Sequence, residues 1–134
     1  MIQASFTADS SSSTADSYDY NVYHDLDQVY NWMDDISAEF SDRVQVSTFG
    51  KSYEDRDLKM MTIRPSSGAT DNNAIFVDCG IHAREWVAHA WCQHLVNYLL
   101  NNPSDDAQIT EISEGLTWYI VPILNPDGYR IEKS

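Results

Sequence analysis

Two short apolar runs on either side of a longer run with helical spacing constrain the fold of this chain most strongly. The first is "AIFVDC" at residues 74–79, and the second is "LTWYIVPIL" at residues 116–124. Both are typical of strands that are buried on both faces of a sheet. Between them, apolar positions three or four apart predict a helix over 85–100. A strand, a connecting helix and a second strand form the centre of an α/β fold.

The remaining segments add a helix, two strands and a shorter helix to this centre. Residues 25–40 have apolar side chains three or four positions apart, and Asp25 with Gln28 makes a capping-box start. Two short strands are predicted at 44–49 and 59–63, with a turn at 50–57 between them. A short helix is predicted at 104–114. The order helix, strand, strand, strand, helix, helix, strand favours an α/β fold with a mixed sheet between helices.

The strand predicted at 116–124 comes late in the chain. A strand this apolar normally has neighbours on both sides and helices on both faces. Only ten residues follow it, so we expect it to lack neighbours and to leave apolar surface exposed around 116–124. The segment "NPDGY" at 125–129 is expected to be a turn, because Pro and Asp-Gly satisfy turn geometry.

Charge and composition exclude some classes of partner. The 134 residues carry a net charge of -13, and no Lys or Arg precedes Arg43. An acidic surface repels phosphate backbones and anionic lipid, so we expect neither nucleic acid nor a membrane surface as a partner. No apolar run approaches the about 20 residues that cross a bilayer. Residues 1–16 are rich in Ser, Thr, Asp and Ala, and they are expected to form a flexible linker.

The turn "GIHARE" at residues 80–85 holds the side chains with the clearest chemical potential. It follows the strand at 74–79, and functional sites in open α/β sheets lie just beyond the carboxyl ends of strands. His82 and Glu85 can both reach one cation, and an imidazole nitrogen with a carboxylate oxygen is a normal part of a zinc site. His-x-x-Glu also occurs often by chance, so the spacing alone favours a surface turn without metal.

The other histidines and the two cysteines leave alternatives open. His89 follows Glu85 by four residues and is the obvious supplementary ligand. An ordinary helix residue is nevertheless the favoured interpretation of both His89 and His94, and His24 is interpreted as a capping or surface residue. Two cysteines fit free core thiols in a cytosolic protein or one disulfide in a secreted protein. The sequence contains neither a Gly-rich phosphate loop nor a Gly-x-Ser-x-Gly nucleophile elbow.

Four segments, in one order, resemble the M14 metallocarboxypeptidases, the carboxypeptidase A/B group. They are "YDYNVYHDLDQVYNWMDDISAEF", "FGKSYEDRDLKMMTI", "DCGIHAREWVAHAWCQHLV" and "VPILNPDGY". The resemblance covers residues 17–134, which it identifies as the N-terminal part of the M14 catalytic domain, and residues 1–16 are then a linker or a remnant of a pro-segment. It implies the phosphorylase/hydrolase-like carboxypeptidase fold, with a mixed sheet between helices, in truncated form.

The resemblance assigns roles to five residues. It makes His82 and Glu85 two of the three ligands of one Zn2+, and it matches Arg84 to an arginine that contacts substrate. Cys79 and Cys92 match a pair that forms a disulfide in related members. Closing a loop of that size stabilises a fold by about 3 kcal/mol on the chain-entropy model. The disulfide also implies a secreted, extracellular protein.

The same resemblance places other functional residues beyond residue 134. These are the third zinc ligand (a histidine), the general-base glutamate and the residues that bind the substrate's C-terminus. No catalytic residue is therefore expected within this chain, and Arg130 is assigned no role. The resemblance implies a monomeric enzyme that releases C-terminal residues from peptides and proteins, of which this chain is an incomplete and inactive fragment.

Two alternatives to this function remain. The first is a related zinc deacylase of small N-acyl amino acids, which shares the two-ligand motif. The "HAREW" context and the matches at the N-terminus argue against it. The second is a non-catalytic acidic protein that uses part of the fold as a binding or scaffold module. A measurement of zinc binding distinguishes the two, because the absence of zinc binding by the full-length form would favour the scaffold module over an enzyme.

Overall fold

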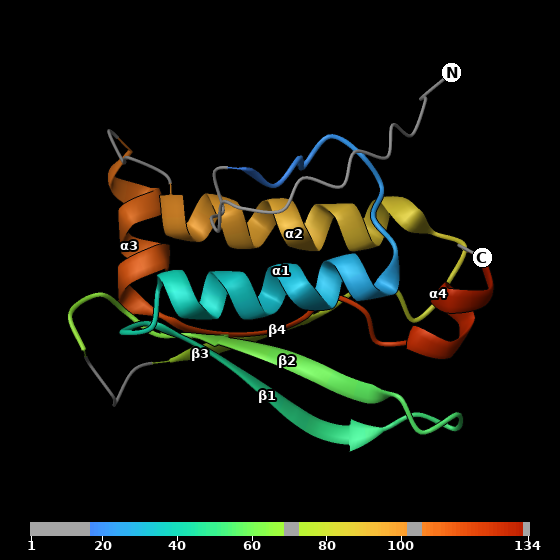
Figure 1. Ribbon diagram of the computed structural model, residues 1–134. Helices are drawn as coiled ribbons and strands as arrows, with labels where there is room; N and C mark the ends of the chain where they lie inside the picture. Colours follow the sequence, from blue (N-terminus) through green and yellow to red (C-terminus); the bar gives the residue numbers. More distant parts are fainter. Residues whose placement is uncertain (1–16, 69–72, 102–105, 133–134) are drawn as a thin grey trace.

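The described part of the protein consists of one four-stranded mixed sheet and the helices that pack around it (Figure 1). The computed structural model describes residues 17–68, 73–101 and 106–132, so the linker expected at 1–16 lies outside the described residues. The elements are α1 (Leu26–Glu39), β1 (Val44–Lys51), β2 (Asp57–Ile63), β3 (Ala74–Asp78), α2 (Trp86–Asn101), α3 (Ala107–Gly115), β4 (Thr117–Val121) and α4 (Pro126–Glu132). No helix within the described ranges is long and apolar enough to cross a membrane.

The strands are ordered β1-β2-β4-β3 across the sheet. β1 and β2 form an antiparallel hairpin, β2 and β4 are also antiparallel, and β3 and β4 are parallel. The parallel pair is joined through α2 and α3, because parallel neighbours need a long crossover connection. The predicted α/β fold with a mixed sheet is therefore confirmed.

The expectation that β4 lacks neighbours is wrong. β4 lies inside the sheet, where it pairs with β2 on one side and β3 on the other. Trp118, Ile120 and Ile123 are buried, so the segment 116–124 does not form the exposed apolar surface that was expected. The missing information was the β2–β4 pairing, which joins residues more than fifty positions apart and leaves no local pattern in the sequence.

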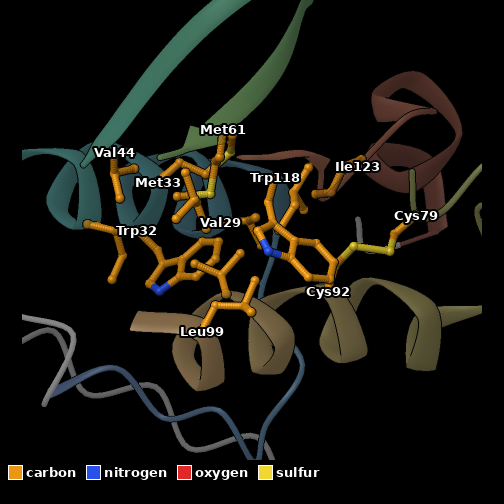
Figure 2. Packing of buried hydrophobic residues seen from close by; sticks show 14 of the residues in the cluster. Val29, Trp32, Met33, Val44, Met61, Cys79, Cys92, Leu99, Trp118 and Ile123 are labelled. Atoms are coloured by element: carbon orange, nitrogen blue, oxygen red, sulfur yellow. A yellow bond between two sulfur atoms is a disulfide. The ribbon is translucent and has the colours of Figure 1, made fainter. Parts of the chain in front are cut away.

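One face of the sheet packs against α1 and α2, which lie side by side over it (Figure 1). Two rows of cross-strand partners form this face, namely Ile75–Trp118–Ile63–Val44 and Val77–Ile120–Met61–Val46. From α1, Val29, Met33 and Ile36 are fully buried against the same cluster. Figure 2 shows part of this cluster, including Met33, Met61 and Trp118, with the Cys79–Cys92 disulfide on the side of α2.

The first helix begins as the sequence predicts. The Asp25 side chain accepts a hydrogen bond from the backbone N–H of Gln28, and the Gln28 side chain accepts one from the backbone N–H of Asp25. This capping box satisfies two N–H groups that the helix itself leaves without partners. Its local chemistry and the regular apolar spacing explain why this helix was predictable.

Strand β3 was predicted to be buried on both faces, and this is wrong. Its side chains alternate in exposure, and Phe76 is 60% exposed. The reason is topological, because β3 is an edge strand and both long helices cover the opposite face. The exposed apolar side chains near this edge are Phe76, Ile81, Val87 and Trp91.

The "NPDGY" segment starts a helix and is not the simple turn that was expected. Helix α4 begins at Pro126, and the Asn125 side chain Oδ1 accepts the backbone N–H of Gly128 at 3.0 Å. Proline is favoured at the first helical position and asparagine just before it, so the residues typical of a turn also suit a helix start. Tyr129 of this helix is buried against His89 of α2, a contact between segments that are distant in the sequence.

Candidate metal site

The turn that follows β3 is tied to the segment that follows β4. The backbone N–H of Cys79 donates to the carbonyl of Val121 at 2.9 Å, and the N–H of Leu124 donates to the carbonyl of Cys79 at 2.8 Å. These two bonds extend the β3–β4 pairing past the end of the strands. The chain therefore leaves the sheet at Gly80 from a fixed position.

Gly80 is required by both its backbone conformation and its surroundings. Its φ is 76°, in the left-handed region that favours glycine. A Cβ at this position would lie 2.0 Å from Nε2 of His89. The His89 ring is 1% exposed and lies 4.3 Å from the ring of Tyr129, centroid to centroid. His89 is thus a core residue of α2, in agreement with its interpretation as an ordinary helix residue, and it lies buried beneath Gly80 and not on the exposed surface of the turn.

His82 and Glu85 lie next to each other on the surface of the turn. His82 Nδ1 is 3.4 Å from Glu85 Oε1, and the two side chains are 74% and 63% exposed. The backbone N–H of Glu85 donates to the carbonyl of His82 at 3.1 Å, which closes the turn just before α2. An accessible imidazole beside an accessible carboxylate fits a zinc ion as two members of its ligand set. No group of three or more potential metal ligands occurs within the part of the chain that the structure describes.

Arg84 and Arg130 have different environments. Arg84 lies between the two candidate ligands in sequence, its side chain is 85% exposed, and its Nε donates to Oε1 of Glu132 at 3.0 Å. Arg130 instead makes an ion pair with Asp27 of α1 at 3.0 Å. Arg84 therefore lies in the same exposed turn as His82, whereas Arg130 is paired with α1.

The disulfide between Cys79 and Cys92 joins the start of the turn to the middle of α2. Both cysteines are buried, and the turn with His82 and Glu85 lies inside the loop that the bond closes. The pairing implied by the family resemblance is present in the structure. Beside Glu85 is an open hollow of about 470 Å³, lined largely by apolar side chains that include Val87 and Trp91.

The residues behind the turn were not recognised from the sequence. Asn125 Nδ2 donates to the backbone carbonyl of Ile81 at 3.3 Å. A Cβ on Gly128 would lie 2.8 Å from the Cβ of Ala83, so α4 approaches the turn closely. The available signal was the "NPDG" segment itself, which the sequence analysis interpreted only as turn geometry.

Two of the four segments that carry the family resemblance meet at Asp127 of α4. Asp127 Oδ1 accepts hydrogen bonds from Ser52 Oγ and from Arg56 Nη1, both at 2.7 Å, and Oδ2 accepts the backbone N–H of Glu54 at 3.1 Å. Partial desolvation raises the pKa of Asp127, but the bonds from Ser52, Arg56 and Glu54 outweigh it and hold the pKa below its ordinary value. The tip of the β1–β2 hairpin is thereby fastened to α4.

The segment before α1 packs over α2 and reaches α4. Tyr18 donates its hydroxyl to Gln93 Oε1 at 2.7 Å and stacks on the ring of His24 at 4.1 Å. The Tyr129 hydroxyl donates to the His24 carbonyl, and burial raises the pKa of Tyr129 to about 12. Asp25, and not His24, is the N-cap of α1, so the capping role considered for His24 is wrong.

Comparison with known proteins gives one consistent family. Residues 29–134 match the peptidase M14 family, described as zinc carboxypeptidase. Human carboxypeptidase O is 39% identical over 114 residues, which cover 85% of this chain and 30% of that protein. Carboxypeptidase B of Astacus astacus is 35% identical over 111 residues, which cover 83% of this chain and 35% of that protein.

Solved structures agree with the sequence matches. The crystal structure of thrombin activatable fibrinolysis inhibitor has a TM-score of 0.77 at 31% identity, covering 84% of this chain and 28% of that chain. Carboxypeptidase A from Helicoverpa armigera has a TM-score of 0.75 at 26% identity, covering 89% of this chain and 28% of that chain. The chain thus spans about 30% of the length of the relatives it matches. Because the family match runs from α1 through the turn and past α4, the chain belongs to the zinc carboxypeptidase family.

Proposed function

We propose that this chain supplies part of the zinc site of a secreted metallocarboxypeptidase, whose whole form releases C-terminal residues from peptides and proteins. The observation that carries the proposal is the pair His82 and Glu85, with Nδ1 and Oε1 3.4 Å apart, on an exposed turn at the carboxyl end of β3. The family match supports the reaction class. The disulfide supports an oxidising, extracellular location.

Three residues of the turn have distinct roles in this proposal. His82, in its neutral form, offers a ring nitrogen to the metal, and Glu85 offers a carboxylate oxygen. Glu85 lies immediately before the first residue of α2, so its position follows from the start of that helix. A zinc ion held there by His82 and Glu85 would supply Lewis-acid polarisation of the scissile carbonyl and a bound water whose pKa is lowered to about 7. Arg84 exchanges its contact with Glu132 for a contact with substrate.

We expect the 134-residue chain to be inactive by itself. Catalytic zinc usually has three protein ligands and one open position, and the turn offers two. The third ligand and the general base are proposed to lie in the part of the longer relatives that this chain does not cover. Incubation of the chain with a peptide should therefore release no C-terminal residue. Hydrolysis that a chelator abolishes would contradict this expectation.

Zinc titration observed by NMR tests the site directly. Addition of zinc to the full 134-residue chain should shift the ring resonances of His82 and leave those of the core residue His89 unchanged. The variant His82→Ala should lose the saturable response, and Glu85→Gln should weaken it. His94→Ala is the matched control, because His94 is an exposed histidine of α2 outside the turn.

The control also defines the result that would refute the site. If His94→Ala reduces zinc binding as much as His82→Ala does, the ion binds surface histidines without preference and the proposal is wrong. Assay of the whole protein with a C-terminal peptide and with an N-acyl amino acid then separates a carboxypeptidase from a deacylase. Release of the C-terminal residue alone is the expected result.

A further inference from the structure

Asn125 connects helix α4 to the turn through the two ends of one side-chain amide. Its Oδ1 accepts the backbone N–H of Gly128 at 3.0 Å and so caps α4. Its Nδ2 donates to the backbone carbonyl of Ile81 at 3.3 Å. The amide therefore uses its acceptor on the helix and its donor on the residue that immediately precedes His82.

The position of Asn125 is fixed by contacts on the other side of α4. Asp127 is bonded to Ser52 and Arg56 in the β1–β2 hairpin. Tyr129 is buried against the ring of His89, which in turn lies under Gly80. Helix α4 is thus anchored both to the hairpin and to the core, and it gives Asn125 a rigid support.

The turn needs such a support because its functional side chains are exposed. His82 and Glu85 have few packing contacts to define their positions, so the backbone has to define them. Within the turn, the N–H of Glu85 donates to the carbonyl of His82. The bond from Asn125 to Ile81 orients the peptide group that leads into His82.

We propose that Asn125 is a positioning residue that holds His82 and Glu85 in the arrangement that receives the metal. This inference rests on the proposed zinc site. Asparagine suits the position because it combines a helix-capping acceptor with a donor. An aspartate of the same shape keeps the cap but has no donor, and it places a carboxylate oxygen against the Ile81 carbonyl.

Amide hydrogen exchange tests the inference without metal. In Asn125→Asp, the N–H of Glu85 should exchange about three- to tenfold faster than in the wild type, the factor expected for the loss of one net hydrogen bond. Asn125→Ser, whose short side chain also caps helices, should give the same loosening. Asn101→Asp is the matched control, since it makes the same substitution in an exposed amide that donates to Asn97 at the opposite end of α2 from the turn. It should leave the Glu85 exchange rate within about twofold of the wild type.

Zinc titration of the same variants gives the second readout. The zinc Kd measured at the His82 ring should rise about three- to tenfold in Asn125→Asp and stay unchanged in Asn101→Asp. Unchanged Glu85 exchange in both Asn125 variants, or unchanged zinc affinity in Asn125→Asp, would overturn the inference. If the wild type shows no zinc response at His82, the proposed zinc site is wrong, and the exchange experiment still decides whether Asn125 orders the turn.

Discussion

Replacing Gly80 by alanine tests whether the turn depends on close contact between its backbone and a buried histidine. The added Cβ would lie 2.0 Å from Nε2 and 2.4 Å from Cδ2 of His89. The ring of His89 is 1% exposed and is packed against Tyr129, so it has little room to move. The residue must also keep a φ of 76°, which side chains with a Cβ rarely adopt.

The expected loss of stability is the sum of these two effects. A non-glycine residue in the left-handed region costs about 1–2 kcal/mol. Forcing extra volume into a packed core costs about 1–3 kcal/mol. The free energy of unfolding should therefore fall by about 2–5 kcal/mol, a large part of the about 5–15 kcal/mol typical of folded domains. This places Gly80→Ala among the most damaging single substitutions in the turn.

Urea unfolding followed by tryptophan fluorescence measures this loss, and two other glycines provide controls. Gly68 has a φ of 72° but nothing within 4 Å of an added Cβ, so Gly68→Ala isolates the backbone cost. It should lose about 1–2 kcal/mol. Gly115, at the end of α3, has an open Cβ position and no positive φ. Gly115→Ala should be neutral or stabilising by less than about 1 kcal/mol.

A double-mutant cycle with His89→Ala separates the steric effect from the backbone effect. The second substitution removes the atoms that the new Cβ would meet, so Gly80→Ala should cost about 1–3 kcal/mol less in the His89→Ala background. Independent, additive losses would refute the argument that Gly80 and His89 are in steric contact. A loss below that of Gly68→Ala in the wild-type background would refute it as well.

Two further variants probe the disulfide and the buried tyrosines. Replacing both Cys79 and Cys92 by alanine should lower the free energy of unfolding by about 3 kcal/mol, because the disulfide closes a loop in the unfolded chain. Reduction of the wild type should lower its urea midpoint as well. A urea midpoint that neither change lowers would contradict the loop-closure argument. Burial raises the pKa of Tyr30 and of Tyr129 to about 12, so the stability from the neutral phenols is present below pH about 10 and is lost as the pH rises toward 12. Tyr129→Phe should therefore flatten the fall in melting temperature over this pH range, and an equally steep fall in the variant would show that Tyr129 does not cause it.

The elements that the sequence predicts well are those whose signals are local. Helix α1 has regular apolar spacing and the Asp25–Gln28 capping box, and both are present in the structure. The hairpin strands and α2 were also placed within a few residues of their observed bounds. Helix α4 was missed because it is seven residues long and its start uses the same residue types as a turn.

The sequence by itself determined the α/β class, the turn with His82 and Glu85 and the family to which the chain belongs, because apolar periodicity and motif spacing are properties of neighbouring residues. Only the tertiary structure decided that β4 lies between β2 and β3, since that pairing joins distant segments. It also decided that Phe76 is exposed on an edge strand. The tertiary structure also decided that Asn125 supports the turn. Asn125 and Ile81 are forty-four residues apart in the sequence, and they meet only when β3 and β4 pair.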